Sequence, residues 1–133
     1  MTRSCRILQV DDDWNDLFLF SHAVQTAALP IEVHPAAGGR DGLHQLPDVS
    51  PDLVLLDLNM PLMSGFDVLA GLRRSAPDLR VVIFSSSSEP ADIDRARQLG
   101  ADGFYVKPTG LSDLVEFVQN LYEHWVNDNF KWP

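Results

Sequence analysis

Short apolar runs recur along the chain at regular intervals, and a polar residue follows each of them. The clearest runs are rich in valine, isoleucine and leucine, and they cover residues 7–10, 53–56, 81–84 and 104–106. Continuous apolar runs of this length are typical of strands that are buried on both faces of a parallel sheet. A less apolar segment at 31–33 is the candidate for one further strand.

Segments with the spacing of amphipathic helices separate these runs. The expected helices cover 15–25, with Asp13 as N-cap, and 39–46, and three more begin after Ser64, after Ser88 or Glu89, and after Ser112. Serine and aspartate are favoured at helix N-caps, and Gly100 suits the position after a helix end. Because strands and helices alternate, the sequence predicts an α/β fold, a doubly wound five-stranded parallel sheet covered by helices.

Residues with chemical capability follow the predicted strands. Three aspartates at 11–13 follow the first run, and Asp57, Ser85 and Lys107 follow later ones. In open α/β sheets the ligand crevice lies outside the carboxyl ends of the strands. We therefore expect a carboxylate cluster, a hydroxyl and an ammonium to converge at one edge of the sheet.

This set of groups suits phosphate chemistry. Clustered carboxylates repel one another, and oxygen ligands of this kind favour Mg²⁺. A bound cation neutralises the oxygens of a transferring phosphoryl group, and Lys107 adds a second positive charge. The Ser85 hydroxyl can donate a hydrogen bond to a phosphoryl oxygen. Asp57 can itself be the nucleophile and form an acyl phosphate.

Composition narrows the classes of partner. The 133 residues include ten Lys plus Arg and nineteen Asp plus Glu, which gives a net charge of −9. Such a chain is repelled by nucleic acids and by anionic membranes. Cys5 is the single cysteine, so an internal disulfide is excluded, and no apolar run approaches the length of a membrane span. One cytoplasmic domain is the expectation.

Four sequence elements together resemble a known family. They are DDD at 11–13, LLDLNMPLMSG at 55–65, the serine after VVIF, and YVKP at 105–108. In this order they resemble the CheY-like receiver domains of bacterial response regulators. The resemblance implies a flavodoxin-like sheet with strand order 2-1-3-4-5. It also implies a receiver domain over residues 1–124 and an apolar extension of the last helix over 125–133.

The resemblance assigns a role to each residue of the acidic site. It implies that Asp57 is the phosphoacceptor. It implies that Asp11, Asp12, Asp57 and the backbone carbonyl of Asn59 hold Mg²⁺.

It also implies a switch and a catalytic lysine. Ser85 takes the place of the switch hydroxyl and Phe104 that of the switch aromatic residue, while Lys107 pairs with the acceptor and then with its phosphate. The Lys107–Pro108 bond is expected to be cis, which proline permits. Two alternatives stay open, because Ser86 competes for the hydroxyl role and Phe104 can be an ordinary core residue.

The implied function is that of a stand-alone two-component response regulator rather than a conventional enzyme. A sensor histidine kinase would phosphorylate it, and it would signal by contact with a downstream protein or by phosphorelay to a phosphotransfer protein. Residues 105–133 also resemble the small regulators that partner bacterial phytochromes. This makes a bacteriophytochrome a candidate kinase. Trp125, Phe130 and Trp132 would then either fold back or build a homodimer through the last helix and tail.

Other functions fit the residues less well. A phosphatase of the haloacid dehalogenase class needs a second acid two residues after its nucleophile, where this chain has Asn59. A flavodoxin-like module would place flavin phosphate against the aspartates at 11–13, which would repel it. A receiver-like scaffold that never takes phosphate has no support in the residues, although they do not exclude it.

Overall fold

Five parallel strands form one sheet in the computed structural model, which describes residues 4–127 of the chain. The strands are β1 (Cys5–Val10), β2 (Ile31–Ala36), β3 (Leu53–Leu56), β4 (Arg80–Ser85) and β5 (Gly103–Val106). Their order across the sheet is β2-β1-β3-β4-β5. The α/β class and the strand order predicted above are therefore confirmed.

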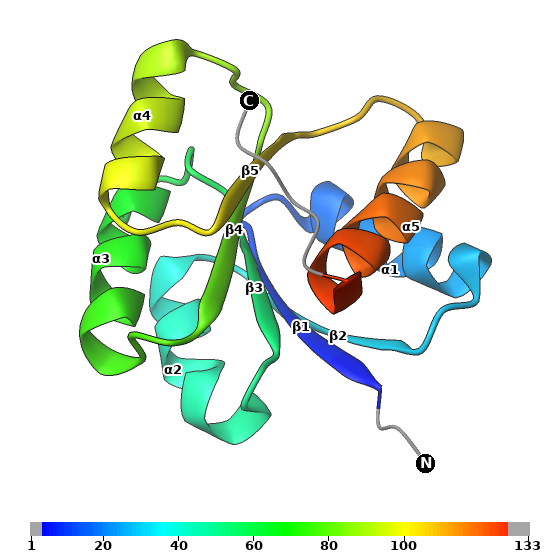
Figure 1. Ribbon diagram of the computed structural model, residues 1–133, viewed down its shortest axis with the longest axis horizontal. Helices are drawn as coiled ribbons and strands as arrows, with labels where there is room; N and C mark the ends of the chain where they lie inside the picture. Colours follow the sequence, from blue (N-terminus) through cyan, green and yellow to red (C-terminus); the bar gives the residue numbers. More distant parts are fainter. Residues whose placement is uncertain (1–3, 128–133) are drawn as a thin grey trace.

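Helices cover both faces of this sheet. They are α1 (Trp14–Ala27), α2 (Gly39–Val49), α3 (Gly65–Ser75), α4 (Pro90–Gln98) and α5 (Leu111–Asn127). Figure 1 shows α1 and α5 on one face and α2, α3 and α4 on the other. None of the helices in residues 4–127 is both long and apolar enough to cross a bilayer.

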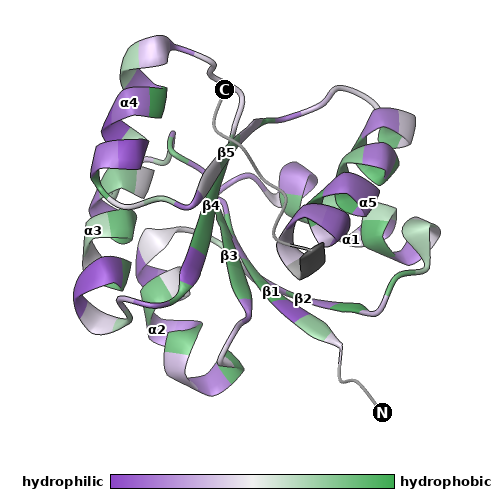
Figure 2. Ribbon diagram, viewed as in Figure 1, coloured by the Kyte–Doolittle hydropathy of each residue, from purple (hydrophilic) through white to green (hydrophobic). Residues whose placement is uncertain are grey.

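The two faces carry separate hydrophobic clusters. Leu56 packs in the cluster under α2, α3 and α4, whereas its neighbour Leu55 packs in the cluster under α1 and α5. Successive side chains of a strand point to opposite faces, so a strand covered on both sides is apolar throughout. In Figure 2 the central strands are accordingly coloured as hydrophobic along most of their length.

Most of the predicted helix caps are confirmed. The Asp13 side chain accepts hydrogen bonds from the backbone N–H groups of Asn15 and Asp16, and Ser64 accepts one from Asp67. Gly100, with a φ of +97°, follows the end of α4. The Asp13 cap starts α1 directly after the two aspartates that follow β1, and this fixes where the helix lies relative to the site.

Three of the boundaries that differ from the sequence prediction involve a cap or a proline. Helix α5 begins at Leu111, so Ser112 lies inside its first turn and is not the N-cap. Strand β2 continues through Pro35, which an edge strand tolerates because one side of its backbone needs no ladder donor. Helix α2 runs past Pro47 to Val49.

Candidate functional site

Two aspartates lie next to each other at the carboxyl edge of the sheet, directly after the strands that carry them. The Asp57 N–H donates to the carbonyl of Val10 at 3.0 Å, and the Asp11 N–H donates to the carbonyl of Ala36 at 3.0 Å. These bonds extend the sheet pairing by one residue past β1 and β3. They place Asp11 and Asp57 side by side.

Asp11, Asp12 and Asp57 form a compact carboxylate cluster. Each offers one oxygen, and these three atoms lie within 4.8 Å of one another. Asp11 and Asp57 are buried, whereas Asp12 is exposed, so the cluster faces solvent on one side. A donor set made only of carboxylate oxygens, open on one side, fits Mg²⁺, which keeps several waters when it binds.

Burial makes these carboxylates costly to ionise. Burial, helped by the Asp11 and Asp12 charges, raises the pKa of Asp57 to about 6, although Lys107 and a backbone hydrogen bond from Asn59 oppose the shift. Burial also raises the pKa of Asp11, against the hydrogen bond from Lys107. The cluster therefore holds unfavourable negative charge that a cation would relieve.

Lys107 brings positive charge to the cluster, as predicted, but its nearest partners differ from the prediction. Its Nζ donates to Asp11 Oδ2 and to Asp16 Oδ2, each at 2.8 Å, and lies 3.7 Å from Asp57 Oδ1. Burial alone would lower the pKa of Lys107, but the hydrogen bonds to Asp11 and Asp16 outweigh it and the pKa lies above its usual range. The ammonium is therefore shared among three carboxylates.

Asp16 is the site residue that the sequence reasoning missed. It belongs to helix α1, whereas the sequence reasoning considered only residues that follow a strand. The available signal was its position, because Asp16 follows the predicted Asp13 cap by three residues and so lies in the first turn of α1, beside the acidic residues at 11–13.

The expected cis bond between Lys107 and Pro108 is wrong. No peptide bond within residues 4–127 is cis, so this one is trans. Trans is the lower-energy isomer of such a bond by about 0.5–1 kcal/mol, which is too little for sequence alone to decide the matter.

Ser85 and Phe104 are both buried. The Ser85 Oγ accepts hydrogen bonds from the Ser87 N–H at 3.3 Å and from the Asn59 side-chain amide at 3.4 Å. Ser86 is exposed, so the buried hydroxyl beside Asn59 is that of Ser85. Phe104 is 5% exposed and packs in the cluster under α2, α3 and α4. The structure therefore places it in the core.

The comparison with known proteins decides the family. A family model described as the response regulator receiver domain matches residues 7–119. The chain belongs to this family. Receiver domains are phosphorylated on an aspartate and bind Mg²⁺, and the carboxylate cluster of this one is consistent with both properties.

Curated relatives and solved structures agree with this assignment. The receiver domain is 34% identical over 118 residues to the transcriptional regulatory protein PrrA of Mycobacterium leprae, covering 89% of this chain and 50% of that protein. It is 39% identical over 84 residues to the nitrate/nitrite response regulator NarL of Escherichia coli, covering 63% of this chain and 39% of that protein. The chain thus spans half or less of the length of these relatives.

Among solved structures, similar ones include regulators connected with phytochrome or red light. The phosphorylated cyanobacterial phytochrome response regulator RcpA is 28% identical with a TM-score of 0.83, covering 96% of this chain and 97% of that one. The response regulator RPA3017 of R. palustris, from red light signalling, is 26% identical with a TM-score of 0.83, covering 95% and 96%. The resemblance found in the sequence is therefore confirmed.

Proposed function

We propose that this receiver domain is a phosphorylation-switched signalling protein whose phosphoacceptor is Asp57. A sensor histidine kinase supplies the phosphoryl group. The P–N bond of its phosphohistidine breaks as a P–O bond to Asp57 forms. The observation that carries this proposal is the placement of the buried Asp57 carboxylate, which is clustered with Asp11 and Asp12 and lies 3.7 Å from Lys107 Nζ.

Mg²⁺ completes the site in this proposal. The carboxylates of Asp11, Asp12 and Asp57 and the backbone carbonyl of Asn59 would hold it, and it supplies charge neutralisation for the incoming phosphoryl oxygens. Lys107 contributes the second positive charge. The raised pKa values of Asp11 and Asp57 support this assignment, because they mark a place where negative charge lacks enough compensation.

Ser85 and Phe104 carry the signal from the site. The buried Ser85 Oγ accepts hydrogen bonds from Ser87 at 3.3 Å and from Asn59 at 3.4 Å. Its own proton can therefore be donated to a phosphoryl oxygen. Phe104 lies on β5 opposite Ile83 of β4. Because Ile83 is only two residues before Ser85, a movement at the end of β4 would displace the neighbours of Phe104. Phosphorylation then shifts the population between two arrangements of this face.

The partners follow from the family and from the neighbours. The output is contact with a downstream protein or transfer of the phosphoryl group to a phosphotransfer protein. A bacteriophytochrome is the proposed kinase, supported by the similarity to RcpA, which is described as a phytochrome response regulator. The net charge of −9 disfavours nucleic acids and anionic membranes as partners.

In this proposal the regulator acts in the cytoplasm, where receiver domains meet their kinases, and it is not a conventional enzyme. The proposed receiver domain occupies residues 1–124 and a proposed apolar extension occupies 125–133, of which 128–133 lie outside the described residues. A homodimer through α5 and the tail is part of the proposal. Trp125 is half-buried in the last described turns of α5, whereas Phe130 and Trp132 lie outside the described residues.

Acetyl phosphate tests the phosphoacceptor directly. With Mg²⁺ present, we expect intact mass spectrometry to show one added phosphoryl group on the wild type and none on Asp57→Asn. When EDTA is added before acetyl phosphate to chelate Mg²⁺, no adduct should form on the wild type either. Full phosphorylation of Asp57→Asn would contradict the proposal.

A further inference from the structure

Lys107 is held by an aspartate that the proposed reaction does not use. Its Nζ lies 2.8 Å from Asp16 Oδ2 and 2.8 Å from Asp11 Oδ2, but 3.7 Å from Asp57 Oδ1. The two short contacts are hydrogen-bonded ion pairs, whereas the third is beyond hydrogen-bond distance. In the unphosphorylated protein the lysine therefore makes its strongest contacts with carboxylates other than the acceptor.

Asp16 differs from the other two partners of Lys107. Asp11 and Asp57 belong to the carboxylate cluster that suits a cation, whereas Asp16 does not. Once Asp11 and Asp57 ligate a cation, their charge is no longer fully available to the ammonium. Asp16 is then the partner that competes for Lys107 with a phosphoryl group on Asp57.

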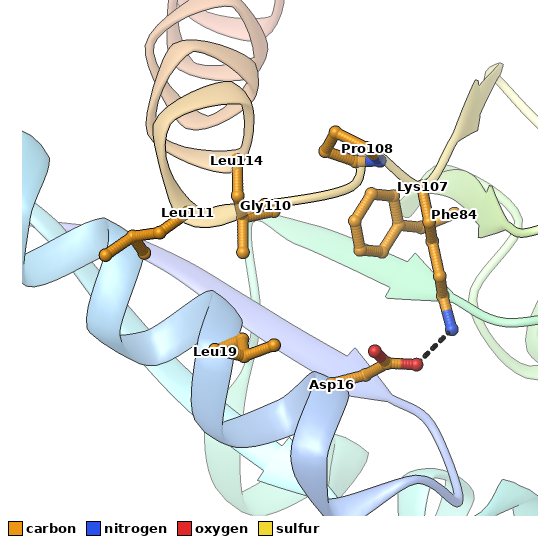
Figure 3. Close-up of a pocket in the computed structure, with 8 residues that line it drawn as sticks. All are labelled: Asp16, Leu19, Phe84, Lys107, Pro108, Gly110, Leu111 and Leu114. Carbon is orange, nitrogen blue, oxygen red and sulfur yellow. Dashed lines mark hydrogen bonds and ion pairs between the residues drawn. The ribbon is translucent and has the colours of Figure 1, made fainter.

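The surroundings strengthen this competition. Asp16 and Lys107 meet at one side of a cavity of about 160 Å³, and Figure 3 shows their ion pair beside the apolar side chains of Leu19, Phe84 and Leu114. The Lys107 side chain is 15% exposed, and its Nζ lies 5.8 Å from the centre of the Phe84 ring. Limited access of water makes an ion pair stronger than it would be on an open surface.

We propose that Asp16 is a positioning residue that holds Lys107 back from Asp57 until a phosphoryl group draws the lysine across. The inference rests on the proposed function, because the competition arises only if Asp57 carries a phosphoryl group. In the step, Lys107 Nζ gives up its hydrogen bond to Asp16 Oδ2 and donates to a phosphoryl oxygen. The ammonium keeps all its protons and no covalent bond changes.

Beryllofluoride, which occupies a phosphoryl site without covalent transfer, measures this competition at equilibrium. With Mg²⁺ present, we expect Asp16→Asn to bind it about threefold more tightly than the wild type, because one partly buried ion pair no longer opposes the movement of Lys107. Fluorine NMR gives the dissociation constants. The matched control is Asp113→Asn in the first turn of α5, which makes the same charge change at an exposed residue outside the contacts of Lys107 and should leave the constant unchanged.

A second background separates positioning from simple charge. If Asp16 acts through the lysine, Asp16→Asn should have no effect on beryllofluoride binding in a Lys107→Met protein. Equal tightening in both backgrounds would overturn the inference, since it would show a through-space effect of the lost charge. Unchanged or weaker binding by the single variant Asp16→Asn would also overturn it. A wild type that takes neither beryllofluoride nor a phosphoryl group would overturn the proposed function itself, a different result.

Discussion

Replacement of Gly65 by alanine is expected to lower the free energy of unfolding by roughly 3 kcal/mol, because the site leaves no room for a side chain there. A Cβ at Gly65 would overlap the backbone carbonyl oxygen of Asp57 and would lie 2.6 Å from the Cα of Leu58. The Gly65 N–H also donates to the Leu58 carbonyl at 3.0 Å, so helix α3 and the loop after β3 cannot separate without losing that bond. Urea denaturation measures the effect.

The same helix offers a control of opposite sign. A Cβ at Gly71 would meet the methyl groups of Leu43 at 3.6 Å, an ordinary van der Waals contact. Gly71→Ala should therefore stabilise the protein by about 0.5–1 kcal/mol through helix propensity alone. Equal stability of Gly65→Ala and the wild type would show that α3 does not approach Asp57 this closely. We also expect Gly65→Ala to be phosphorylated more slowly, because the displaced backbone carries the acceptor.

Asp57→Asn is expected to stabilise the metal-free protein by about 1–3 kcal/mol at pH 7. Burial raises the pKa of Asp57 from 3.8 to about 6, so the folded state holds a proton that the unfolded state releases between these two values. Stability then falls as the pH rises through this window, and at pH 7 the charged carboxylate is a net cost. The neutral amide of asparagine avoids this cost.

The pH dependence distinguishes this explanation from a general effect of lost charge. The difference in the free energy of unfolding between Asp57→Asn and the wild type should disappear as the pH is lowered from 7 to about 4. At pH 7, Mg²⁺ should reduce this difference because it binds to and stabilises the folded wild type. Asp94→Asn, at an exposed position of α4, should change stability by less than about 0.5 kcal/mol at either pH. An Asp57→Asn protein that is less stable than the wild type at pH 7 would contradict the account.

The strands were the most predictable part of the fold. For β3 the predicted and observed residues are the same, 53–56, because a fully buried parallel strand is apolar throughout and ends where polarity begins. Strand β2 was underestimated. As an edge strand it carries His34 and Pro35, whose types do not indicate a strand.

The site was predictable to the extent that it lies at strand ends. Asp11, Asp57 and Lys107 each follow a strand, so the topology alone brings them together. The role of Asp16 was not predictable in this way, because Asp16 reaches Lys107 from a helix and its pairing depends on where the Asp13 cap starts α1. The isomer of the Lys107–Pro108 bond rests on an energy difference too small to be inferred from residue types.

Localisation of the phosphoryl group is the most direct test of the central claim. A phosphorylated histidine kinase should be mixed with the wild-type protein and Mg²⁺, and the product reduced with sodium borohydride, which converts an acyl-phosphorylated aspartate to homoserine. We predict that tandem mass spectrometry finds homoserine at position 57 and leaves Asp11, Asp12 and Asp16 unmodified. Homoserine at one of those three positions, with Asp57 intact, would contradict the assignment of the acceptor.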